Sequence, residues 1–279
     1  MSNHTGGQQM RITFKKRLVQ SAVLALSVLL ALTCFACTKP EPEDEPVEEP
    51  VFVYESPYDW SNLVRENGRL SYMKGWMPAS VSGIDVSEHQ GVIDWDAVAA
   101  DGIDFAIIRL GTRGYTEGLT YFDIHFYENL EGARNAGIKV GVYFFSQAIN
   151  DKEALEEAEF AIRALENIPL DYPVFFDYET ISDYAGRANN LTDEQLTRNA
   201  KIFCDYIAAN GYTPMIYGNI KILERIDPEL RDLYGVWLAE YGVQSPNAQF
   251  DFIMWQYSNS GIVAGIDSPV DMDILFLYP

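Results

Sequence analysis

Residues 80–279 consist of short apolar runs that alternate with amphipathic stretches of helical length. Strand-like runs occupy 81–87, 105–111, 139–146, 173–179, 213–219, 235–241, 252–258 and 270–276. Helical periodicity is found over 94–101, 122–136, 151–166 and 192–210. Repeated strand–helix–strand units predict parallel strands joined by right-handed crossovers. Near-continuous apolar strands are typical of a sheet that is covered on both faces.

The last three predicted strands follow one another with little room for helices between them. We therefore predict an α/β fold, an irregular TIM-like (β/α)5(β)3 barrel over residues 80–279, with a doubly wound open sheet as the alternative. Asp151 and Thr192 are expected to cap the N-termini of two helices, the latter with Gln195 at the capping-box offset. Gly137 and Gly211 occupy positions where a glycine commonly ends a helix.

The first 79 residues have a different character. Residues 1–9 resemble a tag, and a basic stretch precedes the apolar segment 22–36, which predicts a secretory signal peptide within residues 1–37. Cys37 follows Ala36 as in the lipobox of bacterial lipoproteins. We therefore expect lipidation of Cys37, a membrane anchor and a cell-envelope location on a periplasmic or outer face. The alternative is an ordinary cleaved signal with an incidental cysteine.

Residues 38–50 are acidic and proline-rich, so they are expected to form an extended tether. Residues 51–79 carry several aromatic side chains and are expected to pack on the barrel. The net charge of −21 argues against nucleic acid as a partner, although the tether supplies part of it. We expect a monomer.

The sequence gives little sign of metal or cofactor chemistry. Its three histidines show no ligand spacing, so neither a metal nor a cofactor is predicted, although a purely carboxylate Ca²⁺ or Mg²⁺ site is left open. His89 is interpreted as a polar loop residue. The nucleophile elbow and the phosphate-binding loop are both missing from the sequence.

Polar and aromatic residues gather where the predicted strands end, which is the functional face of a parallel barrel. Candidate site residues on these ends are Asp85, Arg109, Tyr143, Phe145, Asp177, Glu179, Tyr217, Trp237, Glu240, Trp255 and Gln256, together with Asp271, which begins the eighth strand. Acids with aromatic walls suit a sugar-binding cleft, because aromatic rings stack on the apolar faces of pyranoses. Core packing is the alternative role for Trp237 and Trp255.

The segment "VFFDYET" (174–180) places two acids inside an apolar run. Side chains alternate along a strand, so Asp177 and Glu179 share a face about 6.6 Å apart along the strand. Two carboxylates held close together in an apolar rim cannot both ionise easily, so one keeps its proton while the other stays charged. Glycosidic bond cleavage requires this division of roles. A salt-bridged framework pair, a metal site or chance are the alternatives.

Seven segments together resemble the glycoside hydrolase family 25 lysozymes, the Chalaropsis-type muramidases. They are "GIDVSEHQGVIDW" (83–95), "FAIIRLG" (105–111), "GVYFFS" (141–146), "FFDYE" (175–179), "VWLAEY" (236–241), "MWQYS" (254–258) and "VDMDILF" (270–276). One departure is Phe144, where the family's third strand usually has histidine, which is expected to alter a subsite.

The resemblance implies a (β/α)5(β)3 barrel that hydrolyses the β-1,4 bond between N-acetylmuramic acid and N-acetylglucosamine in peptidoglycan. It implies Glu179 as general acid and Asp177 as its charged partner, with Asp85 and Asp271 (or Asp273) as further site acids. Substrate-assisted retention is the favoured mechanism; direct nucleophilic attack and inversion are the alternatives. The rival functions are a chitinase-like or endo-N-acetylglucosaminidase enzyme and a non-catalytic peptidoglycan-binding lipoprotein.

Overall fold

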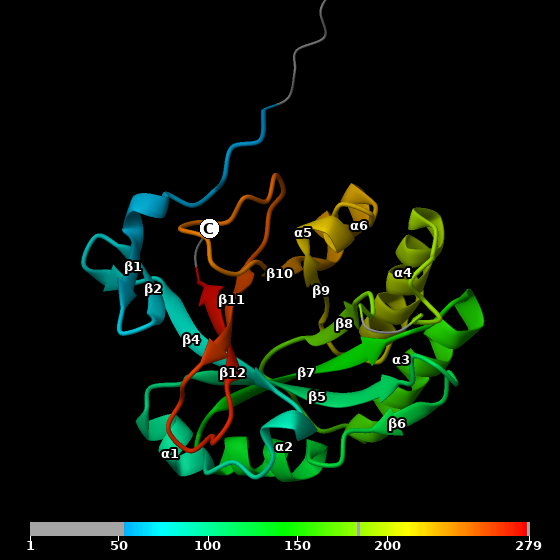
Figure 1. The fold of residues 1–279 in the computed structure, drawn as a ribbon, viewed down its shortest axis with the longest axis horizontal. Coiled ribbons are helices and arrows are strands. Elements are labelled where there is room, and N and C mark those ends of the chain that lie inside the picture. Colours follow the sequence, from blue (N-terminus) through cyan, green and yellow to red (C-terminus); the bar gives the residue numbers. More distant parts are fainter. Residues whose placement is uncertain (1–52, 183–184, 278–279) are drawn as a thin grey trace, which may run out of the picture. The chain divides into compact units, whose positions relative to one another are not determined.

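A computed structural model describes residues 53–182 and 185–277, and residues 53–279 form a compact unit of their own. The signal, lipidation and tether predictions for residues 1–50 lie outside the described part. Eight strands close into a barrel in the order β4-β5-β7-β8-β9-β10-β11-β12 (Figure 1). They are β4 (Ser80–Val86), β5 (Phe105–Arg113), β7 (Lys139–Ser146), β8 (Val174–Tyr178), β9 (Pro214–Asn219), β10 (Val236–Ala239), β11 (Met254–Gly261) and β12 (Val270–Phe276).

The barrel closes because β4 pairs with both β5 and β12. All neighbouring strands are parallel except β12, which runs antiparallel to β11 and to β4. Helices follow the first five of these strands and lie outside the ring (Figure 1): α1 (Trp95–Ala100), α2 (Phe126–Asn135), α3 (Asp151–Leu165), α4 (Asp193–Ala209), α5 (Ile220–Leu223) and α6 (Pro228–Tyr234). The (β/α)5(β)3 prediction is confirmed, and closure excludes the open sheet.

The helix ends follow local capping chemistry. Thr192 caps α4 as expected, since its side chain accepts a hydrogen bond from the Gln195 backbone N–H at 3.2 Å. The cap expected at Asp151 is wrong by one residue: Asn150 accepts from the Glu153 N–H at 3.0 Å, and Asp151 is the first helical residue. Within the described residues, every helix is too short or too polar to cross a bilayer.

Several short elements were not predicted. A three-stranded antiparallel sheet joins β1 (Leu63–Glu66), β2 (Arg69–Lys74) and β3 (Met77–Pro78), while β6 (Thr120–Phe122) pairs with β5. Two 3₁₀ turns cover Trp60–Asn62 and Glu88–Gln90. The segment before the barrel packs on β12, because the Tyr58 ring lies 4.3 Å from the Phe276 ring and its hydroxyl donates to the Phe252 carbonyl at 2.7 Å.

Alternation along the strands divides the core into two parts. One set of side chains fills the barrel interior: Phe105, Ile107, Phe175, Met215, Tyr217, Trp237, Ala239, Met254 and Leu275. The opposite set packs between strands and helices. The interior is so full that a Cβ on Gly83 would lie 2.2 Å from the Phe105 ring, which explains a glycine in mid-strand. With its body filled, the barrel can hold a ligand only at its rim.

Candidate active site

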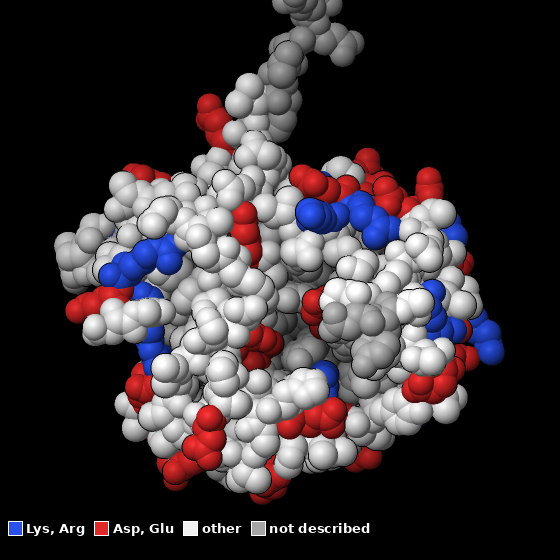
Figure 2. Space-filling model, viewed as in Figure 1, with Lys and Arg blue, Asp and Glu red and all other residues white. Residues whose placement is uncertain are grey.

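A cavity of about 220 Å³ opens at the carboxyl ends of the parallel strands. It is visible as a hollow with acidic side chains near the centre of the face in Figure 2. Its wall brings together residues from most of the barrel strands: Asp85, Val86, Ser87, His89, Gln90, Arg109, Tyr143, Phe145, Asp177, Glu179, Tyr217, Trp237, Gln256 and Asp271. Ten of these fourteen wall residues are ones that the sequence singled out, so strand-end reasoning finds most of the wall.

Asp85 and Asp271 meet because β12 runs against its neighbours. The start of β12 reaches the rim where the parallel strands end, and the register pairs Asp271 with Asp85. Asp273 lies two residues deeper on the same face, fully buried, and accepts a hydrogen bond from Trp237 Nε1 at 2.8 Å. Burial and the neighbouring Asp273 and Asp271 carboxyls raise the pKa of Asp85 well above its usual range, and burial raises the pKa of Asp271 to about 6.

Asp177 is on β8 and Glu179 follows the end of that strand, and both line the cavity. Asp177 is 3% exposed, and its Oδ1 has no hydrogen-bond partner among the described residues. Burial raises the pKa of Asp177 well above its usual range, repulsion from Glu179 adds to this, and Arg109 opposes it. Burial, together with Asp271, also raises the pKa of Glu179. The pair therefore retains a proton near neutral pH.

The two acids of this pair differ in depth. Asp177 is the deeper carboxyl, and the pKa of both acids is raised. The physical reason is desolvation: only Arg109 favours the ionised form of Asp177. A ligand that donates a hydrogen bond to Asp177 would change this balance.

Arg109 and Gln256 are polar residues of the cavity wall whose side chains are fixed by several partners. Arg109 is fixed by two ion pairs, from Nε to Asp123 Oδ2 at 2.7 Å and from Nη2 to Glu88 Oε1 at 2.9 Å. Gln256 donates from Nε2 to Asp85 Oδ2 at 2.5 Å, and its Oε1 accepts from the hydroxyls of Tyr217, at 2.8 Å, and of Tyr241. These contacts leave little freedom for the side chains around the acids.

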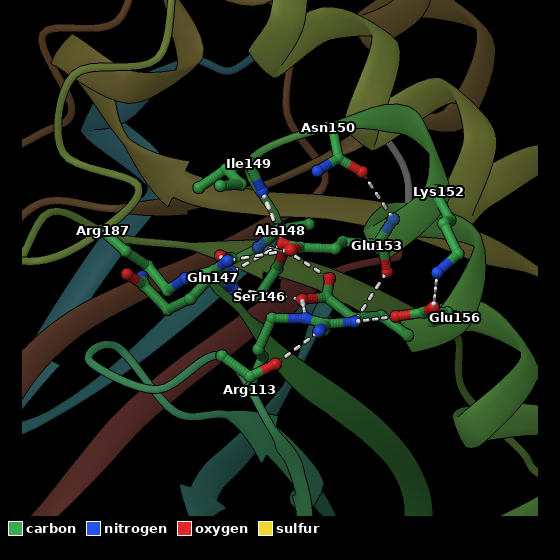
Figure 3. A network of polar contacts seen from close by, with 12 residues as sticks. Arg113, Ser146, Gln147, Ala148, Ile149, Asn150, Lys152, Glu153, Glu156 and Arg187 are labelled. Atoms are coloured by element: carbon green, nitrogen blue, oxygen red, sulfur yellow. Dashed lines mark hydrogen bonds and ion pairs between the residues drawn. The ribbon is translucent and has the colours of Figure 1, made fainter.

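A second set of polar residues forms a network around the start of α3 (Figure 3), and one of them supports the Glu179 backbone. Gln147 donates from Nε2 to the Glu179 carbonyl at 2.9 Å, and its own carbonyl accepts from Arg187 at 2.9 Å. Arg187 also forms a two-pronged ion pair with Glu153, at 2.6 and 2.8 Å. This chain of contacts ties the segment after β8 to the start of α3.

Two expectations about side-chain direction are wrong. Trp255 was expected to wall the cleft, but it is fully buried in the outer core, where its Nε1 donates to the Glu240 carbonyl at 2.8 Å. Phe144, expected to alter a subsite, packs outside the barrel with Phe160 and Phe203, at ring distances of 5.8 and 6.3 Å. Both residues lie between inward-facing neighbours, so alternation sends them outward.

Other residues were placed differently or overlooked. Glu240 lines an adjoining cavity rather than the first one, together with Lys221, which sequence reasoning did not single out. His89 and Gln90 do line the first cavity, from the 3₁₀ turn that follows β4. Their signal was position alone, since both follow a strand end that carries Asp85. Among the described residues, no group of three or more His, Cys, Asp or Glu is arranged to hold a metal ion.

Comparisons with known proteins agree with this architecture. The family model for glycosyl hydrolases family 25 matches residues 84–266. An autolytic lysozyme of Clostridium acetobutylicum is 32% identical over 194 residues, which cover 69% of this chain and 55% of that protein. Lysozyme M1 of Streptomyces globisporus is 29% identical over 203 residues, which cover 69% of this chain and 67% of that protein.

A solved structure of a bacterial lysozyme has a similar fold. The bacterial lysozyme of Streptomyces coelicolor superposes with a TM-score of 0.59 at 27% identity, covering 69% of this chain and 90% of that chain. The chain spans about half the length of the clostridial relative, 55% of it. The match of the family model covers well over half of the chain and includes Asp85, Asp177 and Glu179. The chain therefore belongs to the glycosyl hydrolases family 25.

Proposed function

We propose that this protein is a lysozyme, a 1,4-β-N-acetylmuramidase that hydrolyses the bond between N-acetylmuramic acid and N-acetylglucosamine in peptidoglycan. The observation that carries the proposal is the meeting of Asp177 and Glu179 in one cavity at the carboxyl ends of the strands. The relatives named as lysozymes support the same activity. The protein acts as a monomer on the glycan strand and requires no cofactor.

Glu179 acts as the general acid in this proposal. Its carboxyl makes no hydrogen bond within the described residues, and its raised pKa keeps a proton available near neutral pH. It is more exposed than Asp177, so it can reach the oxygen that leaves the muramic acid. Proton transfer to that oxygen accompanies cleavage of its bond to the anomeric carbon.

Asp177 orients the substrate's 2-acetamido group. The unpartnered Oδ1 of Asp177 accepts the acetamido N–H, and this hydrogen bond favours the ionised form of Asp177 while the shared proton stays on Glu179. The acetamido oxygen then attacks the anomeric carbon as the glycosidic bond breaks. Water opens the resulting ring with Glu179 as general base, so configuration is retained. Asp85 and Asp271 line the same wall, and Asp271, with a pKa of about 6, is charged at neutral pH and stabilises positive charge at the anomeric carbon.

Product analysis tests the activity directly. Purified peptidoglycan is incubated with the protein, and the released fragments are reduced and identified by mass spectrometry. We expect reducing ends of N-acetylmuramic acid. Reducing ends of N-acetylglucosamine would instead support the endo-N-acetylglucosaminidase alternative, and binding without release would support the non-catalytic one.

The stereochemical proposal needs a separate measurement. Proton NMR during the first minutes of hydrolysis of a defined muroglycan shows which anomer forms first. Retention predicts the β-anomer before mutarotation. First appearance of the α-anomer would establish inversion and remove the acetamido step while leaving Glu179 as the acid.

A lipid anchor at Cys37 completes the proposal and places the enzyme in the cell envelope. It rests on the residues before the barrel, since a basic stretch, an apolar segment and Ala36 precede Cys37. Mass spectrometry of the mature N-terminal peptide from membranes tests it. We expect a diacylglycerol-modified Cys37, with Cys37→Ala releasing the protein from the membrane; an unmodified N-terminus would contradict it.

A further inference from the structure

A second cavity, of about 560 Å³, adjoins the first. The two share only Glu179 and Tyr217 in their walls. The remaining wall of the second cavity comes from the ends of β9 and β10 and from the start of α5: Asn219, Ile220, Lys221, Ala239, Glu240 and Tyr241. Glu179 therefore stands on the boundary between two spaces.

The position of Glu179 between the two cavities determines which part of the glycan lies in each of them. This assignment rests on the proposed function. A general acid must contact the oxygen between the sugar that is cleaved and the sugar that leaves. The cleaved sugar must also meet Asp177, which lines only the first cavity. The leaving side of the glycan is therefore assigned to the second cavity.

The wall of the second cavity, as far as the described residues form it, carries one positive charge. Lys221 is exposed and makes no ion pair or hydrogen bond within the part of the chain that the structure describes. Glu240, the other charged group there besides Glu179, has both oxygens engaged by Asn247, from its backbone N–H at 2.8 Å and its side-chain amide at 2.7 Å. A lysine without such partners among the described residues, in the same cavity wall as Glu179, contrasts with a chain whose net charge is −21.

We propose that Lys221 binds a carboxylate on the 3-O-lactyl substituent of the second sugar on the leaving side. The first leaving sugar is N-acetylglucosamine, and the next is another N-acetylmuramic acid, whose lactyl group carries either its own carboxylate or a peptide stem with carboxylates. Ile220, Ala239 and Tyr241 supply apolar surface beside the lysine. Lys221 is thus a specificity residue for anionic, muramic-acid-containing glycans over neutral ones.

The test compares Lys221→Gln with wild type on three forms of one glycan: with peptide stems, with stems removed by an amidase so that lactyl carboxylates are free, and with all carboxylates converted to neutral amides. We expect kcat/KM of Lys221→Gln to fall about three- to ten-fold on at least one anionic form, mainly through KM, with the loss shrinking in high salt. The loss should disappear on the amidated glycan. Lys221→Arg should restore most of the activity.

The two anionic forms identify the source of the carboxylate. A loss on the stem-bearing form alone assigns it to the peptide, and a loss on the stem-free form alone assigns it to the lactyl group. Lys139 is exposed at the start of β7, whereas both cavities lie where the parallel strands end. Lys139→Gln is therefore the matched control and should behave as wild type. Equal kcat/KM for Lys221→Gln and wild type on both anionic forms would overturn the inference, whereas failure of wild type on every form would overturn the proposed function.

Discussion

Glu157 and Asp177 are buried carboxylates near the same end of the barrel, but they differ in their hydrogen-bond and ion-pair partners. Glu157 on α3 is fully buried, yet Arg113 pairs with it at 2.8 Å and Ser146 donates to it at 2.6 Å. Asp177 is almost as buried, but one of its oxygens has no partner among the described residues. The difference separates a carboxylate that holds the scaffold together from one that is available to a substrate.

The comparison extends to ionisation. Burial raises the pKa of Glu157 to about 7, against the opposing effects of Ser146, Arg113 and the Gln147 N–H. Burial raises the pKa of Asp177 well above its usual range, with only Arg109 in opposition. Unpartnered buried acids lower the stability of a fold, so their presence in a cavity indicates that function maintains them.

The largest expected effect is on catalysis. Glu179→Gln removes the proposed acid but keeps the shape of the side chain, so we expect turnover of peptidoglycan to fall by about 10²- to 10⁴-fold. Reducing-end release measures this. Glu131→Gln, exposed on α2, is the control and should keep wild-type turnover. Turnover of Glu179→Gln within a few-fold of wild type would remove Glu179 from the mechanism.

The largest expected effect on stability comes from substitution of Glu157, the buried carboxylate that is paired with Arg113. Glu157→Ala leaves Arg113 buried without its main partner, so the free energy of unfolding should fall by about 3–5 kcal/mol. Urea denaturation followed by circular dichroism measures it. Glu157→Gln keeps an acceptor for Ser146 and should fall by less. A change below about 1 kcal/mol in Glu157→Ala would show that the network is not structural.

A smaller effect concerns pH and the cavity acids. The pKa of Asp271 rises from 3.8 to about 6 on folding, so the folded state binds the proton more tightly. Its contribution to stability is greatest below pH 4 and is lost as the pH rises through 6. Asp271→Asn should therefore be the more stable protein at pH 7, by roughly 1–3 kcal/mol, with a flatter dependence between pH 4 and 7.

Urea denaturation at several pH values checks this prediction. Asp85, Asp177 and Glu179 titrate in the same direction and leave some slope in the variant. Asp96→Asn, exposed on α1, is the control. Lower stability of Asp271→Asn than wild type at pH 7 would mean that Asp271 is held by attractive contacts, as Glu157 is.

The smallest effect is expected at the surface. Lys201 and Asp205 lie 2.6 Å apart on α4, with their side chains 55% and 49% exposed. Solvent screens such a pair, so Lys201→Ala should change the free energy of unfolding by less than about 0.5 kcal/mol. A loss above 1 kcal/mol by urea denaturation would show that burial is not what separates strong from weak pairs in this protein.

The barrel could be predicted because its strands are long apolar runs that keep their register with parallel neighbours. The sheet of residues 63–78 and the short β6 could not, since two- to six-residue strands with exposed faces carry little apolar signal. Asp85, Asp177 and Glu179 were found because each lies where a strand ends, and Asp271 because it begins the last strand. Trp255 was misplaced although it neighbours Gln256, and adjacent strand residues cannot both face the same cavity.

The supporting network was harder to foresee. Glu157 reads as an ordinary helix acid, yet Ala154, Ala158 and Ala161 on α3 are fully buried, and a period of 3.6 places Glu157 on their face. That spacing was the available signal. Its partners Arg113 and Ser146 come from other elements, so tertiary structure alone brings them together. Lys221 is similar, because its cavity forms only when β9 and β10 lie side by side.

One paired measurement tests the central distinction most directly. Peptidoglycan turnover and free energy of unfolding are measured on wild type, Glu179→Gln and Glu157→Gln, two substitutions of identical chemistry. The account predicts that Glu179→Gln loses at least about 10²-fold in turnover with unchanged or higher stability, while Glu157→Gln loses stability and keeps most of its turnover below its unfolding midpoint. The reverse pattern, or equal losses in both variants, would contradict it.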